Sequence, residues 1–269
     1  MKGQPVSTAG HHDTPTANGQ DDRTAAVTTW LLFAVATSMI IPLVMTSFLG
    51  DDIFDSVVDG VTAYTGTSLS RFVLDVNWGI FKSDGRLQMP ALFQYFGIFA
   101  AVPNLLAYKF LQIICVLINL GTFYVFLRSL RVARLTSLVI VALAIATLQV
   151  RVYHDPILGF SVLYQTMLEF NLISFILFAR YCRTDRSIDL AASAFFFFLA
   201  LFYYETSYPL AAVHVFIAVR LKGWSGWRRA TPLLGLSGFF FALSLGVRHF
   251  VNMRPTADYR LGLDPLLYA

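Results

Sequence analysis

The amino-acid sequence predicts an all-α fold, a polytopic bundle of about seven transmembrane helices with amphipathic helices in the first outer loop. Of the 269 residues, 57% are hydrophobic and only 13% are charged, which is more apolar surface than a soluble domain needs. Apolar segments near the length that crosses a bilayer recur along the chain. Basic residues gather in every second connection between those segments.

Seven apolar segments are candidates for membrane-spanning helices. A crossing needs about twenty residues, so the segments at 135–150 and 208–220 are short. Glycines inside or at the ends of these segments, and Pro209, are compatible with membrane helices. The candidate spans are 27–49, 105–127, 135–150, 159–179, 187–204, 208–220 and 231–249.

The chain divides into three parts. Residues 1–26 are polar and lack apolar periodicity, which predicts a disordered cytoplasmic tail. Residues 27–250 are expected to form the membrane module, and their first span is too long for the core of a cleaved signal peptide. Residues 251–269 are expected to begin an outer loop, which would make the chain a truncated or minimal form.

The arginines predict how the helices are oriented. Short loops at 128–134, 180–186 and 220–229 hold ten of the twenty Lys and Arg residues. All three lie on one side if the seven spans are real, and short basic loops stay in the cytoplasm. The N-terminus is therefore expected to be cytoplasmic, and the net charge of +4 is explained without nucleic-acid binding. The regions 50–104, 150–158, 204–207 and 250–269 then face the opposite side.

The outer region 50–104 is too long to be a plain linker. Residues 55–64 and 68–77 carry apolar side chains at helical spacing, which predicts amphipathic helices at the membrane surface. Residues 78–90 are rich in turn-forming types, including Asp84-Gly85. A long loop that holds its own helices is more often functional than a simple connection.

Asp51 and Asp52 begin a concentration of acids directly after the first span. Six of the sixteen Asp and Glu residues fall between positions 51 and 84. Carboxylates are costly near a bilayer, and a partly desolvated one has a raised pKa that suits a general base. The competing interpretation is that one of the two caps the N-terminus of the next helix.

Four other residues on the predicted outer face are candidates for substrate binding. Arg86 suits a phosphate, or it pairs with an aspartate of its own loop. His154 and Asp155 precede a proline and either orient a substrate hydroxyl or form a capped turn. Glu205 follows two tyrosines, which fits either a sugar-binding corner or an interfacial aromatic belt.

Arg248 belongs to a group of basic residues on the outer face that runs against the positive-inside trend. A lipid-linked phosphate presented at that face would explain the group, whereas weak constraint on late loops would explain it equally well. The other members are His249, Arg254 and Arg260.

Glu169 lies within the fourth predicted span. An acid inside the membrane is a functional candidate by default. Gln165 and Asn171 are close enough in sequence to satisfy it as a purely structural residue.

Nucleotide, serine-hydrolase and metalloprotease motifs are absent from the sequence. The two cysteines, Cys115 and Cys182, lack metal-ligand spacing and are expected at different depths, which disfavours a disulfide. A divalent metal is compatible with the acid cluster, although no motif requires one.

The arrangement resembles the GT-C class of membrane glycosyltransferases. The resemblance rests on a first span followed by a long outer loop that opens with the acidic pair Asp51-Asp52 and contains surface helices, and it covers residues 27–250. It implies transfer of a sugar from a polyprenyl-phosphate donor to an acceptor glycan, lipid or protein, on the outer face of a bacterial cytoplasmic membrane. It also implies that one aspartate of the pair is the base and that an outer arginine holds the lipid phosphate.

Two other classes stay open. A lipid or small-molecule transporter should carry paired polar residues deep in several spans, or inverted repeats. A non-catalytic membrane assembly subunit would not need the acid cluster. The polar candidates of this chain concentrate at the outer face, which favours the transferase.

Overall fold

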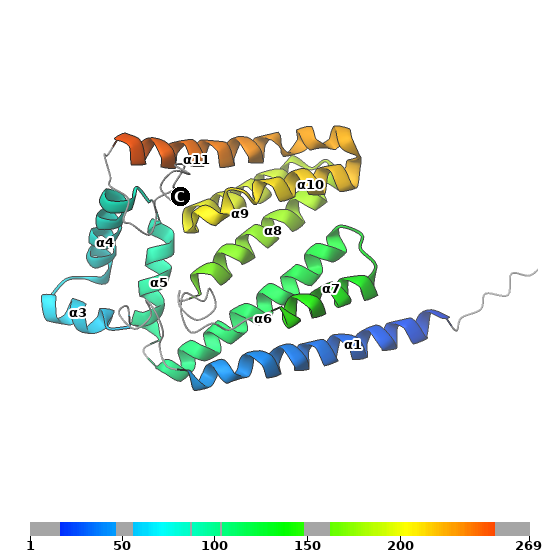
Figure 1. Cartoon of the computed structure of the whole chain (residues 1–269), viewed down its shortest axis with the longest axis horizontal. Coiled ribbons are helices and arrows are strands. Elements are labelled where there is room, and N and C mark those ends of the chain that lie inside the picture. Colours follow the sequence, from blue (N-terminus) through cyan, green and yellow to red (C-terminus); the bar gives the residue numbers. More distant parts are fainter. Residues whose placement is uncertain (1–16, 47–55, 87, 103, 148–161, 251–269) are drawn as a thin grey trace, which may run out of the picture.

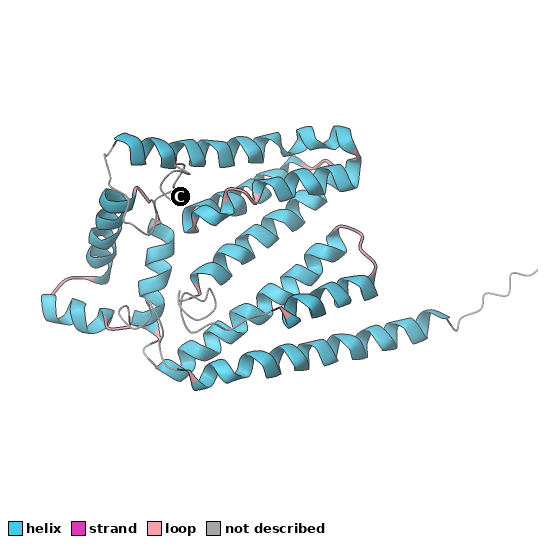
Figure 2. Ribbon diagram, viewed as in Figure 1, coloured by secondary structure: helices cyan, strands magenta, loops and turns pink. Residues whose placement is uncertain are grey.

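A computed structural model describes residues 17–46, 56–86, 88–102, 104–147 and 162–250. Within these ranges the chain is helical and contains no strand (Figure 2). The predicted all-α class is therefore confirmed for the described part of the chain.

A helix occupies the position of each of the seven predicted spans. In α8 the helix runs about one turn further than the hydropathy pattern, because it ends only where Asp185 adopts the left-handed conformation (φ 57°). The helices are α1 (Ala17–Ile40), continued by the 3-10 helix η1 (Ile41–Met45), α6 (Leu105–Ser129), α7 (Arg134–Ala146), α8 (Leu163–Thr184), α9 (Ser187–Tyr203), α10 (Ala211–Lys222) and α11 (Thr231–Phe250).

Three stretches of the described chain are long and apolar enough to cross a membrane: Arg23–Met45, Leu105–Ser129 and Trp224–His249. This composition indicates a membrane protein, and it does not establish all seven predicted crossings. The helix α7 has only 13 residues, or about 20 Å at 1.5 Å per residue. The helix α8 is longer, but polar residues along it lower its hydropathy.

The predicted disordered tail, 1–26, is wrong for residues 17–26. The helix α1 begins at Ala17, ten residues before the predicted span. Alanines at positions 17, 25 and 26 favour helix. Once the apolar part of a helix is formed, each added residue gains a hydrogen bond without a new nucleation step.

The region 56–102 forms three helices, as Figure 1 shows: α3 (Val58–Thr65), α4 (Leu69–Asp84) and α5 (Met89–Ala101). The first two match the predicted amphipathic helices. Ser68 caps α4 by accepting from the Arg71 backbone N–H at 3.3 Å. Gly66 and Gly85 end α3 and α4 with positive φ angles of 65° and 68°, a conformation that glycine adopts without strain.

The helix α5 was not predicted, and the turns expected at 78–90 begin later than predicted. The helix α4 continues through Asp84, so most of the predicted turn-rich stretch is helical. On one side α5 packs Phe96 against the α3–α4 pair, where Val73 is fully buried. On the other side, Gln94 accepts from the Tyr203 hydroxyl at 2.5 Å and donates to Thr166 at 2.7 Å. This helix therefore joins the α3–α4 pair to α8 and α9.

The helices α8, α9 and α10 meet through buried polar side chains. The Ser174 and Ser193 hydroxyls each donate to the backbone carbonyl of the other at 2.9 Å, which brings α8 and α9 close together. The Nε2 atom of His214 lies 3.0 Å from the Ser174 hydroxyl. The rings of Phe175, Phe178 and Phe197 surround the imidazole, with centroids 4.8–5.2 Å away.

The two ends of the bundle differ in charge and structure. In Figure 1 the α6–α7, α8–α9 and α10–α11 connections, which carry the basic residues, lie at one end of the long helices. The helices α3, α4 and α5 lie at the opposite end, beside the last turns of α9 and α11. This arrangement agrees with the alternation that the basic loops predict.

Asp185 ties two of the basic connections together. Its carboxylate pairs with Arg229, at the end of the 3-10 helix η3 (Trp224–Ala230), and with Lys222 at 3.7 Å. The hydrogen bond from Arg229 is the main cause that lowers the pKa of Asp185 below its ordinary value. The α8–α9 turn is thereby held against the segment that connects α10 and α11.

The membrane orientation can be tested with two single cysteines in a Cys115→Ser, Cys182→Ala background. We expect Arg186→Cys to react with an impermeant thiol reagent only from the cytoplasmic side, because it lies in the basic α8–α9 turn. Tyr64→Cys, on α3 and 93% exposed, should react only from the outer side. Labelling of both positions from the same side of sealed vesicles would contradict the predicted topology.

The Asp185 contact should make stability depend on pH. Because the folded pKa is lowered, the contact stabilises the fold above the ordinary pKa of an aspartate, about 3.9, and is lost as the pH falls through the lower folded pKa. Asp185→Asn tolerates the left-handed backbone and removes the charge. We expect it to melt below the parent at pH 7, with a difference that shrinks in acid.

The measurement is the melting temperature of the purified protein in detergent across a series of pH values. Asp75→Asn is the matched control, because Asp75 forms an exposed pair with Arg71 within α4. It should shift the melting temperature at pH 7 by about 1 °C or less. An equal effect of the two substitutions at pH 7 would show that the Asp185 contact does not hold the loops.

Candidate functional site

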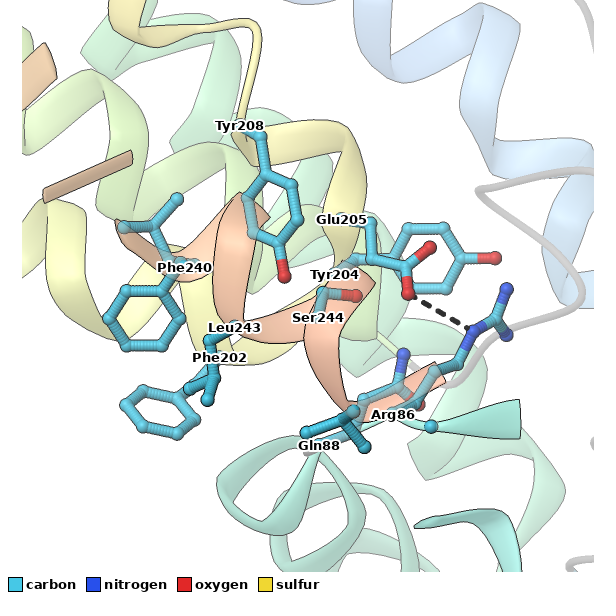
Figure 3. A pocket seen from close by; sticks show the side chains of 12 residues that line it. Arg86, Gln88, Phe202, Tyr204, Glu205, Tyr208, Phe240, Leu243 and Ser244 are labelled. Carbon is cyan, nitrogen blue, oxygen red and sulfur yellow. Dashed lines mark ion pairs between the residues drawn. The ribbon is translucent and has the colours of Figure 1, made fainter. Parts of the chain in front are cut away.

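Three of the residues predicted to bind substrate meet at the end of the bundle that carries α3–α5. Arg86 follows the glycine that ends α4, Glu205 begins the 3-10 helix η2 (Glu205–Ser207) after α9, and Arg248 lies in the last turn of α11. The Glu205 Oε1 atom pairs with the Arg248 guanidinium and lies 3.5 Å from the Arg86 Nε atom. Figure 3 shows the pair formed by Arg86 and Glu205.

The backbone explains why Glu205 reaches both arginines. The helix α9 ends at Tyr203, and Tyr204 is fully extended (φ −162°, ψ 148°). This turn places the Tyr204 ring beneath Arg86, whose guanidinium carbon lies 5.4 Å from the ring centroid. A guanidinium over an aromatic face gains about 0.5–1 kcal/mol at exposed sites and more when desolvated.

These groups are largely removed from solvent. The side chain of Arg86 is 11% exposed, and those of Glu205 and Arg248 are 28% and 29% exposed. Partial burial strengthens charge–charge interactions relative to water. Two guanidinium groups are thereby brought to the same carboxylate.

A small open hollow, with a cavity volume of about 30 Å³, lies beside the ion pairs (Figure 3). Its mouth carries Arg86, Gln88, Glu205, Tyr208 and Ser244, whereas apolar side chains from α9 and α11 form the remaining wall. This combination of a charged rim and an apolar wall suits an amphiphile with an anionic group. The apolar lining consists of Leu201, Phe202, Phe240, Leu243 and Val247.

The remaining predicted site residues are Asp51, Asp52, His154 and Asp155, and they lie outside the described residues. Arg86 and Glu205 pair with each other, a partnership that the sequence analysis did not name for either residue. Tyr204 was noticed only as a neighbour of Glu205. Gln88 and Ser244 were missed, because nothing local in the sequence distinguishes them from other polar residues near helix ends.

Glu169 takes part in a second polar cluster, with different partners from those expected. The Glu169 Oε1 atom accepts from the Thr122 hydroxyl of α6 at 2.8 Å. Asn171 instead donates to the Met167 carbonyl and to Ser207. Positions 169 and 171 are two residues apart, so they point to different sides of α8. The expectation that Asn171 satisfies Glu169 is therefore wrong.

No three His, Cys, Asp or Glu side chains lie close enough to hold a metal ion in the described ranges. The chain matches no protein-family model, and no curated protein or solved structure is similar to it at a significant level. The family resemblance therefore stays a prediction, and the chemistry is argued from the site itself.

The coupling across the site can be measured with a double-mutant cycle on Glu205→Gln and Arg248→Gln. Because both side chains are about 70% buried, we expect a coupling free energy of about 0.5–1.5 kcal/mol, above the usual value for exposed pairs. The readout is the free energy of unfolding of the purified protein in detergent. The control cycle is Arg71→Gln with Asp75→Asn on α4. If the Glu205–Arg248 coupling is no larger than the coupling of this exposed pair, the Glu205–Arg248 contact is not a partly buried ion pair.

Proposed function

We propose that this chain is a membrane glycosyltransferase that moves a sugar from a polyprenyl-phosphate donor to an acceptor on the non-cytoplasmic face of a bacterial cytoplasmic membrane. The observation that carries the proposal is the meeting of Arg86, Glu205 and Arg248 at the rim of an amphiphilic hollow. In the proposed topology, with seven spans and a cytoplasmic N-terminus, this rim faces the compartment where such donors are presented.

The charges of the rim fit a phosphodiester. A sugar linked through one phosphate to a lipid carries a single negative charge, and two arginines lie together at this rim. Guanidinium groups bind phosphate oxygens in a planar, two-pronged geometry that lysine cannot reproduce. The apolar wall between α9 and α11 is suited to the first part of the lipid chain.

The base is proposed to come from Asp51 or Asp52. Asp51 follows the last residue of η1 by six positions in the sequence. General-base catalysis by a positioned carboxylate typically contributes 10²–10⁴ in rate. The carboxylate takes the proton of the acceptor hydroxyl, whose oxygen attacks the anomeric carbon of the sugar, while the bond from that carbon to the phosphate oxygen breaks and polyprenyl phosphate leaves. The acceptor can be a glycan, a lipid or a protein.

Transport of an ion or small molecule is a second candidate function. The observation that favours it is the Glu169 cluster, because buried acids between membrane helices mark ion and substrate pathways. A transporter would move its substrate with the outer aspartates replaced, whereas the proposed transferase would lose its activity.

The test of the base compares Asp51→Asn and Asp52→Asn with the parent at equal protein level in membranes. We expect one of the two to lower lipid-linked sugar transfer by about 10²–10⁴, because asparagine keeps the size of aspartate and cannot accept the proton. Asparagine caps helices about as well as aspartate, so a capping role would leave transfer nearly unchanged. Asp59→Asn, an exposed acid in the first turn of α3, is the control that should retain activity.

The same assay separates donor binding from chemistry. Arg86→Gln and Arg248→Gln should raise the KM for the lipid-linked donor more than they lower kcat, because they remove charge recognition and leave the base in place. Near-parental transfer in both aspartate variants would remove the catalytic assignment. Unchanged KM values in both arginine variants would remove the donor site.

A further inference from the structure

The polar residues between α6 and α8 form two rungs close to the middle of α6. In the first rung the Asn119 Nδ2 atom donates to the Gln165 backbone carbonyl at 3.0 Å. In the second, the Thr122 hydroxyl donates to Glu169 at 2.8 Å. Residues three or four apart are neighbours on one face of a helix, so the rungs lie one turn apart on both helices.

Both rungs leave an oxygen atom buried and without a hydrogen-bond partner among the described residues. These atoms are Asn119 Oδ1 and Glu169 Oε2. The amide assignment of Asn119 is fixed by chemistry, because a carbonyl can only accept and must therefore face the NH₂ group. Asn119 as a whole is only 7% exposed. Leaving a buried acceptor unsatisfied costs about 1–3 kcal/mol, and more when it carries charge.

The two orphan atoms are acceptors, and the donors of the rungs, one N–H of Asn119 and the Thr122 hydroxyl, point to the Gln165 carbonyl and to Glu169 Oε1. A cation would satisfy both orphan acceptors at once. Oxygen ligands suit hard cations, and one carboxylate supplies a single negative charge. A monovalent cation leaves the cluster neutral, whereas a divalent cation leaves a net charge in apolar surroundings, which is costly.

The depth of the cluster also fits an ion site. Asn119 and Thr122 lie just past the centre of the 25-residue helix α6, which is one of the candidate spans. Ion sites of membrane proteins lie near the middle of the bilayer between facing helices. The cationic residues of α6 lie toward its two ends: Lys109 is ten residues before Asn119, or about 15 Å along the axis, and Arg128 is six residues after Thr122, or about 9 Å.

We propose that Asn119, Thr122 and Glu169 bind a monovalent cation between α6 and α8. The ligands are Glu169 Oε2 and Asn119 Oδ1, with the Thr122 hydroxyl and Glu169 Oε1 beside them. The bound ion neutralises the carboxylate and ties the two helices together. This site is separate from the rim of Arg86, Glu205 and Arg248, and it does not depend on the transferase function.

The experiment is thermal melting of the full chain in detergent, in sodium chloride or in choline chloride at equal ionic strength. A ligand that binds only the folded state stabilises it by mass action, so saturating sodium should raise the melting temperature by about 5 °C. The rise should follow a single-site titration curve. Glu169→Gln should abolish it, whereas Asp75→Asn on α4 should retain it.

Three outcomes would overturn the proposal. The first is equal melting temperatures in sodium and choline, and the second is stabilisation by calcium in place of sodium. The third is a sodium effect that persists in Glu169→Gln. Should Glu169→Gln fail to fold, direct binding of radioactive sodium to the parent and to Asn119→Ala decides, and the parent must bind a single ion more tightly than the variant.

Discussion

The hydrogen bonds among Ser174, Ser193 and His214 are the constraint on which the rest of the bundle depends. In a membrane, helices gain little from the hydrophobic effect against one another, so small residues and buried polar contacts decide which helices pack. The serines let α8 and α9 approach closely, and the histidine adds α10 to the same point. This contact fixes how α9 lies against α8. It thereby also fixes the position of Glu205, which follows the end of α9.

The helix α5 connects these helices to the end of the bundle that carries α3 and α4. Its Gln94 connects Tyr203 of α9 with Thr166 of α8 by two hydrogen bonds. Its aromatic side chains pack against the α3–α4 pair, and Arg86 follows Gly85 at the end of α4. Arg86 and Glu205 are 119 positions apart in the sequence, and they meet because this short helix fixes one element against the other.

The sequence predicted the features that recur along the chain. It could not predict which residues from distant parts of the chain meet in the fold. Long apolar segments and basic loops recur along the chain. The positions of seven helices and the charge difference between the two ends of the bundle could therefore be predicted from the sequence. The helix α5 was not predicted, because its thirteen residues are apolar except for Gln94 and resemble neither a full crossing nor an amphipathic helix. The partner of Glu169 was also hidden, because Thr122 lies on another helix and sequence proximity favoured Gln165 and Asn171.

The contacts of Glu205 meet an electrostatic requirement of the end of the bundle that carries α3–α5. A partly buried guanidinium, such as that of Arg248, needs a counter-charge. Glu205 supplies one negative charge for two guanidinium groups. One carboxylate thereby holds an arginine from the end of α4 and an arginine from α11 at the same place, beside the apolar side chains of α9 and α11.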